Sequence, residues 1–183
     1  MLLEKIREFD IPTVDVVEPF DNILSLVEYT RNLKDAEGFI VAFEDGHRIK
    51  IKAEQYVRIH KILDRVRFDR NIVNLIINEN LDDVIPMLPQ KQVTRIRDFE
   101  RHFWASFEGT VMRLRTAFNI AKEHGDRKSI ALNFVPTLSH KADAQFIFRM
   151  IDGHNIRDLM LEHVRKNIST NVKWEMCAKW MGM

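Results

Sequence analysis

Apolar residues recur along this chain with two different periods, and the change between them divides the sequence. Residues 38–44 and 47–52 are rich in β-branched and aromatic side chains and flank a turn sequence, which predicts two short strands. From residue 54 onward apolar positions recur at spacings of three and four, which predicts helices. The expected fold class is therefore α+β and mostly α: a short N-terminal α/β segment with a β-hairpin, followed by an all-helical domain.

The longest predicted helix runs from Gln90 to His124, and Gly125 is well placed to end it. Its apolar face consists of Val93, Ile96, Phe99, Phe103, Phe107, Val111, Leu114 and Phe118. Further helices are expected after Asp21, at 54–67, at 71–80, from Asp126 to before Pro136, at 139–151, at 155–168 and around Trp174 and Trp180. The expected N-caps of these helices include Asp21, Asp126, Ser139 and Asn155.

The hairpin turn is predicted at Asp45-Gly46, the sequence preferred in a two-residue type I′ turn. Counting outward from it pairs Val41 with Lys50 and Phe39 with Lys52. This register predicts one core face of Ile40, Ala42, Ile49 and Ile51, and a second face of Phe39, Val41, Phe43, Arg48, Lys50 and Lys52. By parity Glu37 lies on the second face, diagonal to Lys52.

Three cations at every second position of one strand need compensation. Arg48, Lys50 and Lys52 lie about 7 Å apart along the strand and repel one another, and only Glu37 is close enough to offset them. Such a face favours an anion, for example a phosphate held between two lysines with a carboxylate alongside to hold a metal ion. The structural alternative is an edge strand that its lysines protect from aggregation.

Composition narrows the class of protein without indicating an activity. The 183 residues suffice for one ordinary domain or two small ones, and 45% apolar with 30% charged residues is a soluble globular balance. The net charge of +1 gives no overall field that attracts nucleic acid. The single cysteine, Cys177, excludes an internal disulfide. No apolar run of membrane-spanning length and no signal-peptide layout occur, which predicts a cytoplasmic, intracellular protein with no membrane partner.

A longer pattern around the hairpin is more specific than its parts. It consists of Glu37-Gly38-Phe39-Ile40-Val41, Asp45-Gly46, Lys50-Ile51-Lys52, Tyr56 and His60. This pattern resembles motifs IV and V of the covalent nucleotidyltransferases, and most closely the ATP-dependent RNA ligases of the bacteriophage T4 RNA ligase 1 type. The segment 125–131 also looks like a stretch in the all-helical C-terminal domain of those ligases.

The resemblance implies a division of the chain and a role for each motif residue. Residues 1–66 would be the C-terminal part of the nucleotidyltransferase domain, and residues 67–183 the all-helical C-terminal domain. Glu37 would help to hold Mg²⁺ near the phosphates of ATP. Lys50 and Lys52 would contact the α-phosphate of the transferred AMP and act as catalytic residues. The implied partner is RNA with 5′-phosphate and 3′-hydroxyl ends, such as a nicked tRNA.

The lysine nucleophile of that family is absent from this sequence. It lies in a K-x-D-G motif, whereas the residues two positions before the two Asp-Gly pairs here are Phe43 and Met150. We therefore expect the C-terminal half of a ligase, which needs the N-terminal half as a partner and does not self-adenylate alone. An excised fragment, the product of a split gene and a decayed copy all remain open.

Basic residues in the helical region are candidates for RNA contacts. They are Arg97, Arg101, Arg127 and Lys128. The structural alternative is an amphipathic helix with a solvated arginine face. This leaves a second functional hypothesis, a non-catalytic RNA-binding module or partner subunit of a split ligase, and a third, an inert remnant.

Overall fold

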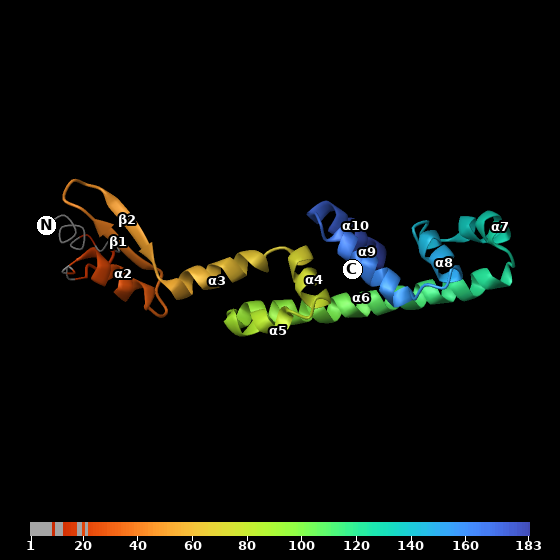
Figure 1. Ribbon diagram of the computed structural model, residues 1–183, viewed down its shortest axis with the longest axis horizontal. Helices are drawn as coiled ribbons and strands as arrows, with labels where there is room; N and C mark the ends of the chain where they lie inside the picture. The colour runs from red at the N-terminus through yellow and green to blue at the C-terminus, as the bar shows by residue number, and fades with distance from the viewer. Residues whose placement is uncertain (1–8, 10–12, 18–19, 21) are drawn as a thin grey trace. The chain divides into compact units, whose positions relative to one another are not determined.

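The computed structural model describes residues 9, 13–17, 20 and 22–183 (Figure 1). The chain divides into two compact units, Met1–Arg58 and Ile59–Met183, and the division falls inside helix α3 (Glu54–Arg65). The predicted boundary after residue 66 lies just past the end of this helix. The predicted fold class is confirmed, because 67% of the chain is helical and the strands of the described residues form one antiparallel hairpin.

The first unit combines a helix with the predicted hairpin. Helix α2 (Ile23–Arg31) begins after Asn22, whose side-chain oxygen accepts a hydrogen bond from the Ser25 N–H at 2.9 Å. The cap predicted from the sequence, Asp21, lies outside the described residues. Strands β1 (Gly38–Ala42) and β2 (Arg48–Lys52) follow and pair antiparallel.

Aromatic rings pack α2 against the hairpin. The ring centroids of Phe20 and Tyr29 lie 5.3 Å apart, and those of Tyr29 and Phe39 lie 6.0 Å apart. Leu26 and Ala53 are buried in the same unit. Because a two-stranded sheet is only marginally stable in water, the hairpin depends on this packing.

The register of the hairpin differs from the prediction by one residue. Ile40, and not Val41, is the partner of Lys50. The connecting loop has three residues, 44–46, and Gly46 has a φ of +86° and donates its N–H across the loop at 3.0 Å. This geometry is a type I turn with a glycine bulge, so the predicted two-residue type I′ turn is wrong.

The shifted register redistributes the apolar side chains but keeps the cations together. One face consists of Phe39, Val41, Ile49 and Ile51, and its Phe39 contacts α2 through Tyr29. The opposite face carries Gly38, Ile40, Ala42, Arg48, Lys50 and Lys52. The predicted core face is therefore wrong, because a slip of one residue moves every side chain of β1 to the other side. Ile40, expected in the core, is 63% exposed.

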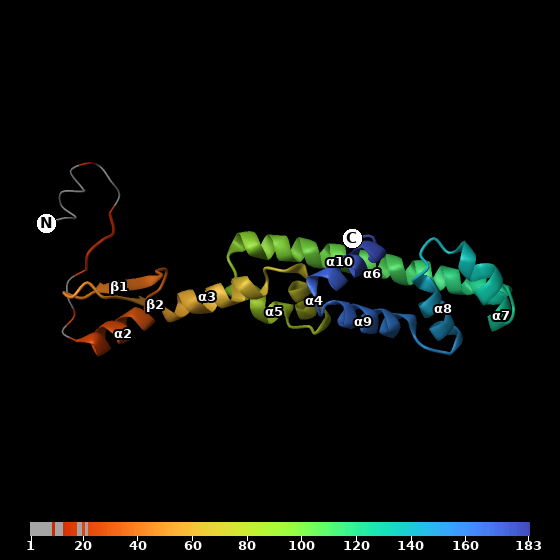
Figure 2. The ribbon, with the colours of Figure 1, turned by 90° about the horizontal axis from the view of Figure 1, so that it is seen from above.

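The second unit is helical throughout its length. After α3 its elements are α4 (Asp69–Ile77), α5 (Leu81–Val84), the 3₁₀ turn η1 (Ile85–Met87), α6 (Gln90–Glu123), α7 (Arg127–Ser129), the π-helical turn η2 (Ile130–Phe134), the 3₁₀ turn η3 (Val135–Thr137), α8 (Asp143–Ile151), α9 (Ile156–Asn167) and α10 (Asn171–Met181). Within this unit α9 and α10 lie beside the middle of α6, and α8 lies nearer its C-terminal end (Figures 1 and 2).

Helix α6 provides the central surface on which the second unit packs. Its predicted apolar face is confirmed, and Phe103, Phe107 and Leu114 are fully buried. Burial of each such side chain contributes about 1.5–3 kcal/mol to folding. Among the described residues no helix, α6 included, combines the length and the apolar character needed to cross a membrane.

Of the three N-cap residues predicted in the second half of the chain, two are confirmed. Asp126 caps α7 and Asn155 caps α9, each by accepting backbone N–H hydrogen bonds. Ser139 does not start a helix: α8 begins four residues later, at Asp143, without a side-chain cap. Asp143 is instead buried and bonded to other helices. The helix expected before Pro136 is broken into short turns, and Pro136 lies inside η3.

Candidate functional site

Glu37 and Lys50 form an ion pair on the exposed face of the hairpin. The Lys50 Nζ lies 2.6 Å from the Glu37 Oε1, and 46% and 43% of the two side chains are exposed. This charge-assisted hydrogen bond lowers the pKa of Glu37 and raises the pKa of Lys50. Both groups therefore stay charged over a wider pH range than either would alone.

Gly38 allows Glu37 to reach this lysine. In the observed register strict alternation would place Glu37 on the face toward α2. Gly38, however, has a φ of +135°, which L side chains rarely adopt, so the alternation is broken here. A Cβ at Gly38 would lie 2.0 Å from the Ile51 carbonyl oxygen. The predicted proximity of Glu37 to the lysines is present in the structure, although the cause is this glycine and not parity.

Tyr56 connects the two motif regions. It lies in the first turns of α3 and hydrogen-bonds to Glu37, which further lowers the pKa of that carboxyl group. Desolvation of the phenol, followed by this hydrogen bond, raises the pKa of Tyr56. The Lys52 Nζ lies 5.5 Å from the centroid of the Tyr56 ring, a cation–π distance. Glu37, Lys50, Lys52 and Tyr56, hereafter the hairpin cluster, thus form one connected group.

The hairpin cluster presents one carboxylate and two ammonium groups on one surface. Lysine ammonium groups bind phosphate oxygens as point charges. Mg²⁺ at nucleotide sites is usually held by one or two carboxylates together with phosphate oxygens and water, so the single carboxylate of Glu37 is a compatible donor. A metal ion bound by Glu37 would replace Lys50 in the ion pair and free its ammonium group for a phosphate. No group of three or more histidine, cysteine or acidic side chains suited to a metal occurs among the described residues.

Arg48 shares the face of Lys50 and Lys52 but not their contacts. It lies at the turn end of β2 and is exposed. Among the residues that the structure describes, Arg48 forms no ion pair with a carboxylate. It is therefore a matched control for the two lysines, with the same sign of charge on the same strand and face.

The predicted RNA-binding arginines on α6 are engaged by neighbouring acids. Arg97 lies 2.5 Å from Asp82 and 2.8 Å from Glu100, and Arg101 pairs with Asp98. Exposed pairs of this kind contribute little to stability, but they do offset the positive charge of the arginines. The amphipathic-helix alternative accounts for both residues, and their role in RNA binding stays a prediction.

The second pair of candidates lies at α7, away from Arg97 and Arg101 along the chain. Arg127 lies 2.6 Å from Asp152, and its guanidinium is 4.8 Å from the centroid of the Phe148 ring. Lys128, next to it, is exposed. Arg127 therefore has a structural role in joining α7 to the end of α8, and its role in RNA binding also stays a prediction.

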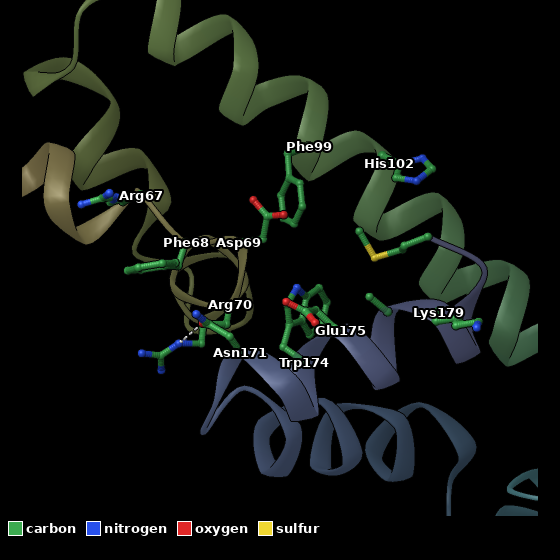
Figure 3. Close-up of a pocket in the computed structure, with 12 residues that line it drawn as sticks. Arg67, Phe68, Asp69, Arg70, Phe99, His102, Asn171, Trp174, Glu175 and Lys179 are labelled. Carbon is green, nitrogen blue, oxygen red and sulfur yellow. Dashed lines mark hydrogen bonds between the residues drawn. The ribbon is translucent and has the colours of Figure 1, made fainter.

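The structure contains a groove of about 530 Å³ in the second unit that the sequence analysis did not predict (Figure 3). Its lining residues are Arg67, Phe68, Asp69, Arg70, Phe99, His102, Asn171, Trp174, Glu175, Ala178, Lys179 and Met183. The available signal was the run Arg67-Phe68-Asp69-Arg70, in which charged residues surround an aromatic residue directly before a helix.

Asp143 is a second feature missed from the sequence. Its side chain is 4% exposed and accepts hydrogen bonds from Arg113 Nε at 3.2 Å and from Trp180 Nε1 at 2.8 Å. The network joins α6, α8 and α10 within the second unit. The sequence pattern around Ser139 gave no sign of this role, because the partners of Asp143 lie on α6 and α10, far away in the sequence.

Comparisons with protein-family models, with curated proteins and with solved structures find no match to this chain. The motif resemblance therefore rests on the residues of the hairpin and of the first turns of α3, together with the segment 125–131. The structure adds contacts among Glu37, Lys50, Lys52 and Tyr56 that the motif spacing does not specify.

Proposed function

We propose that this chain supplies the metal- and phosphate-binding residues of an ATP-dependent RNA ligase of the bacteriophage T4 RNA ligase 1 type. The reaction joins an RNA 5′-phosphate to a 3′-hydroxyl through enzyme-adenylate and RNA-adenylate intermediates. The observation that supports this function is the hairpin cluster itself. The three residues that the motifs select, Glu37, Lys50 and Lys52, are linked by an ion pair and by shared contacts to Tyr56.

The hairpin cluster would act on the α-phosphate during AMP transfer. Attack by a lysine nucleophile on this phosphorus forms a phosphoramidate bond and releases pyrophosphate. Lys50 and Lys52 would neutralise the negative charge on the α-phosphate oxygens as the bond to pyrophosphate breaks. Glu37 would hold Mg²⁺, which supplies further positive charge at the phosphates. Tyr56 would position Glu37 through their hydrogen bond.

The nucleophile has to come from another polypeptide segment, because no K-x-D-G motif occurs in this sequence. The chain alone is therefore expected not to form an enzyme-adenylate. The proposed partner is a nucleotidyltransferase half that carries this motif. Ile40, which lies on the same face as the lysines, is 63% exposed and is compatible with such a contact.

Reconstitution tests this proposal. The chain is mixed with a nucleotidyltransferase half that contains K-x-D-G, and transfer of labelled AMP to protein and then to 5′-phosphorylated RNA is measured with Mg²⁺ and ATP. We expect both transfers and ligation with the unsubstituted chain, and none with the double variant Lys50→Ala, Lys52→Ala. Full ligation by the double variant would contradict the assignment.

A further inference from the structure

The groove of Figure 3 brings together three parts of the chain that are far apart in sequence. Residues Arg67–Arg70 form one wall where α4 begins, α6 contributes Phe99 and His102, and α10 with the residues after it contributes the rest. We propose that this groove binds a nucleotide of single-stranded RNA, with the base on its aromatic surface and the adjoining phosphates on its cations. The inference rests on the proposed function and names a substrate-binding site for it.

Three aromatic residues line the groove: Phe68 and Phe99 have accessible rings, and the buried Trp174 supports them from below. Trp174 is buried, and its ring lies 6.3 Å from that of Phe103, so its position is fixed by the core. Phe99 is half-buried beside it, and Phe68 at the rim is 42% exposed. Single-stranded nucleic acids bind to surfaces of this kind by stacking their bases on aromatic rings, which every base can do.

The cations of the groove are held in place without being neutralised. The Arg70 Nε donates a hydrogen bond to the Asn171 Oδ1 at 2.7 Å, and its Nη1 donates to the Ile168 carbonyl oxygen at 3.3 Å. These acceptors are uncharged, so they fix the guanidinium and leave its positive charge available. Arg67 lies over the Phe68 ring at 5.7 Å, which also leaves its charge uncompensated.

The acids of the groove offset only part of this charge. Asp69 lies 3.4 Å from Arg95, a residue outside the groove, so its charge is already paired. Glu175 is the other acidic side chain of the lining. Within the part of the chain that the structure describes, Arg67, Arg70 and Lys179 form no ion pair with a carboxylate. The side chains therefore leave an excess of positive charge, which favours a ligand with phosphate groups.

Size and polarity favour one nucleotide over a duplex. The volume of about 530 Å³ lies within the range of sites for small ligands, about 300–1,000 Å³. A base that is stacked and paired inside a duplex could not stack on the rings of Phe68 and Phe99, whereas an unpaired base could. Asn171 and Glu175 supply polar groups at the rim that can bond to a 2′-hydroxyl or to a base edge.

Anisotropy of a fluorescein-labelled single-stranded oligouridylate, titrated with the full chain, tests the inference. Phe68→Ala should weaken binding about tenfold, because one stacking surface is lost. Lys179→Ala should lower the slope of log affinity against log salt by about 0.7, as expected for one lost phosphate contact on a single strand. The matched controls are Met176→Ala and Lys173→Ala, which change exposed residues of α10 outside the groove and should leave both quantities unchanged.

A second readout localises the RNA directly. An oligonucleotide that contains 4-thiouridine should photo-crosslink to peptides with Phe68 or Phe99. Absence of RNA binding, crosslinks elsewhere only, or equal effects of the groove and control substitutions would overturn the inference. The anisotropy titration contains neither ATP nor the nucleotidyltransferase half, so its result does not depend on AMP transfer, and failure of the groove and failure of the ligase proposal are distinguishable.

Discussion

At the scale of single residues, the carboxylate of Glu37 offsets the repulsion among the cations of the hairpin. Without it, Lys50 would stand between Arg48 and Lys52 with no compensating charge on the described part of the face. With it, a carboxylate 2.6 Å away stabilises the ammonium form of Lys50. The same carboxylate is the oxygen ligand in the hairpin cluster that a divalent metal would bind.

Glu37→Gln should lower the pKa of Lys50 toward its ordinary value of 10.5, because the hydrogen bond that Lys50 donates to the Glu37 carboxylate is the main cause of the present increase. NMR titration of the lysine side-chain signals measures this change. Glu44→Gln, which removes an exposed carboxylate from the turn of the same hairpin, is the control and should leave Lys50 unchanged. If the pKa of Lys50 is the same in Glu37→Gln as in the unsubstituted chain, the ion pair between Glu37 and Lys50 is absent in solution.

The residues of this cluster could be predicted from the sequence, but the geometry that joins them could not. Alternation along β2 correctly placed Arg48, Lys50 and Lys52 on one face. The turn type was misjudged because Asp45-Gly46 also fits a three-residue loop with Gly46 as the bulge residue. The break in alternation at Gly38 depends on its backbone conformation, which no residue pattern specifies.

At the scale of elements, the second unit is joined by a buried polar network as well as by its apolar core. Asp143 on α8 accepts hydrogen bonds from Arg113 on α6 and from Trp180 on α10. The Arg113 guanidinium also lies 5.3 Å from the centroid of the Trp180 ring. Because the carboxylate is almost fully buried, each of its partners is needed to compensate for its lost hydration.

Asp143→Ala should destabilise the second unit by about 3–5 kcal/mol, since it leaves a partly buried guanidinium and a Trp N–H without their acceptor. Urea denaturation followed by circular dichroism measures the free energy of unfolding. Asp152→Ala breaks the exposed pair with Arg127 and should cost less than about 1 kcal/mol. Equal losses for the two variants would contradict the structural role of Asp143.

Stability of the second unit should also fall as the pH drops below 6.5. His163 packs between Phe146 at 5.2 Å and Trp180 at 5.1 Å, and burial, followed by the charge of Lys166, lowers its pKa below the ordinary 6.5. The unfolded chain therefore binds a proton at a higher pH than the folded chain does. The contribution of the neutral His163 ring to the free energy of unfolding is complete above pH 6.5. It is lost as the pH falls from 6.5 through the folded-state pKa of His163.

Urea titrations above and below pH 6.5 measure this dependence, and His163→Gln should flatten it. All other residues are the same in both proteins, so the difference between the two pH profiles isolates His163. A variant whose profile matches that of the unsubstituted chain would show that this ring is not desolvated in solution.

The positions of the long helices were predictable because a helix that packs on a core needs apolar residues at spacings of three and four along its sequence. This holds for α6, whose apolar face matches the buried residues. The start of α8 was not predictable in the same way. Ser139 satisfies the pattern of an N-cap, but the buried position of Asp143 is set by contacts with α6 and α10 that are distant in sequence.

At the scale of the whole molecule, the chain consists of two compact units, and the core that contains Phe103 and Phe107 lies within the second unit. Cys177 belongs to the core of the second unit, and burial raises its pKa to about 12. The thiolate is the reactive form, so the folded unit should resist alkylation at neutral pH. Alkylation of Cys177 is therefore a probe of unfolding of the second unit alone.

Gly38→Ala should disrupt the hairpin without changing the rate at which iodoacetamide modifies Cys177. The added Cβ would meet the Ile51 carbonyl oxygen at 2.0 Å, which β1 and β2 cannot accommodate in their present pairing. Mass spectrometry measures the alkylation rate, and hydrogen exchange of the β1 amides reports on the hairpin. Faster alkylation in the variant would contradict independent stability of the two units.

The groove is the part of the molecule that sequence analysis was least able to predict. Its walls combine Arg70 with Asn171 and Trp174, residues separated by about a hundred positions. The spacing of apolar residues predicted the helices that carry these residues. It did not predict that the start of α4 and the helix α10 lie next to each other in the fold. Charge patterns pointed instead to Arg97 and Arg101, which the structure shows paired with acids.

The rate of AMP transfer in the reconstituted ligase, compared between Lys52→Ala and Arg48→Ala, tests the central claim most directly. Both substitutions remove one cation from the same face of β2, so any general effect of charge is shared. If the hairpin cluster stabilises the α-phosphate, Lys52→Ala should slow the transfer about a hundredfold or more, and Arg48→Ala should leave it close to the unsubstituted rate. Equal rates for the two variants would contradict the assignment of this face as a phosphate-binding site.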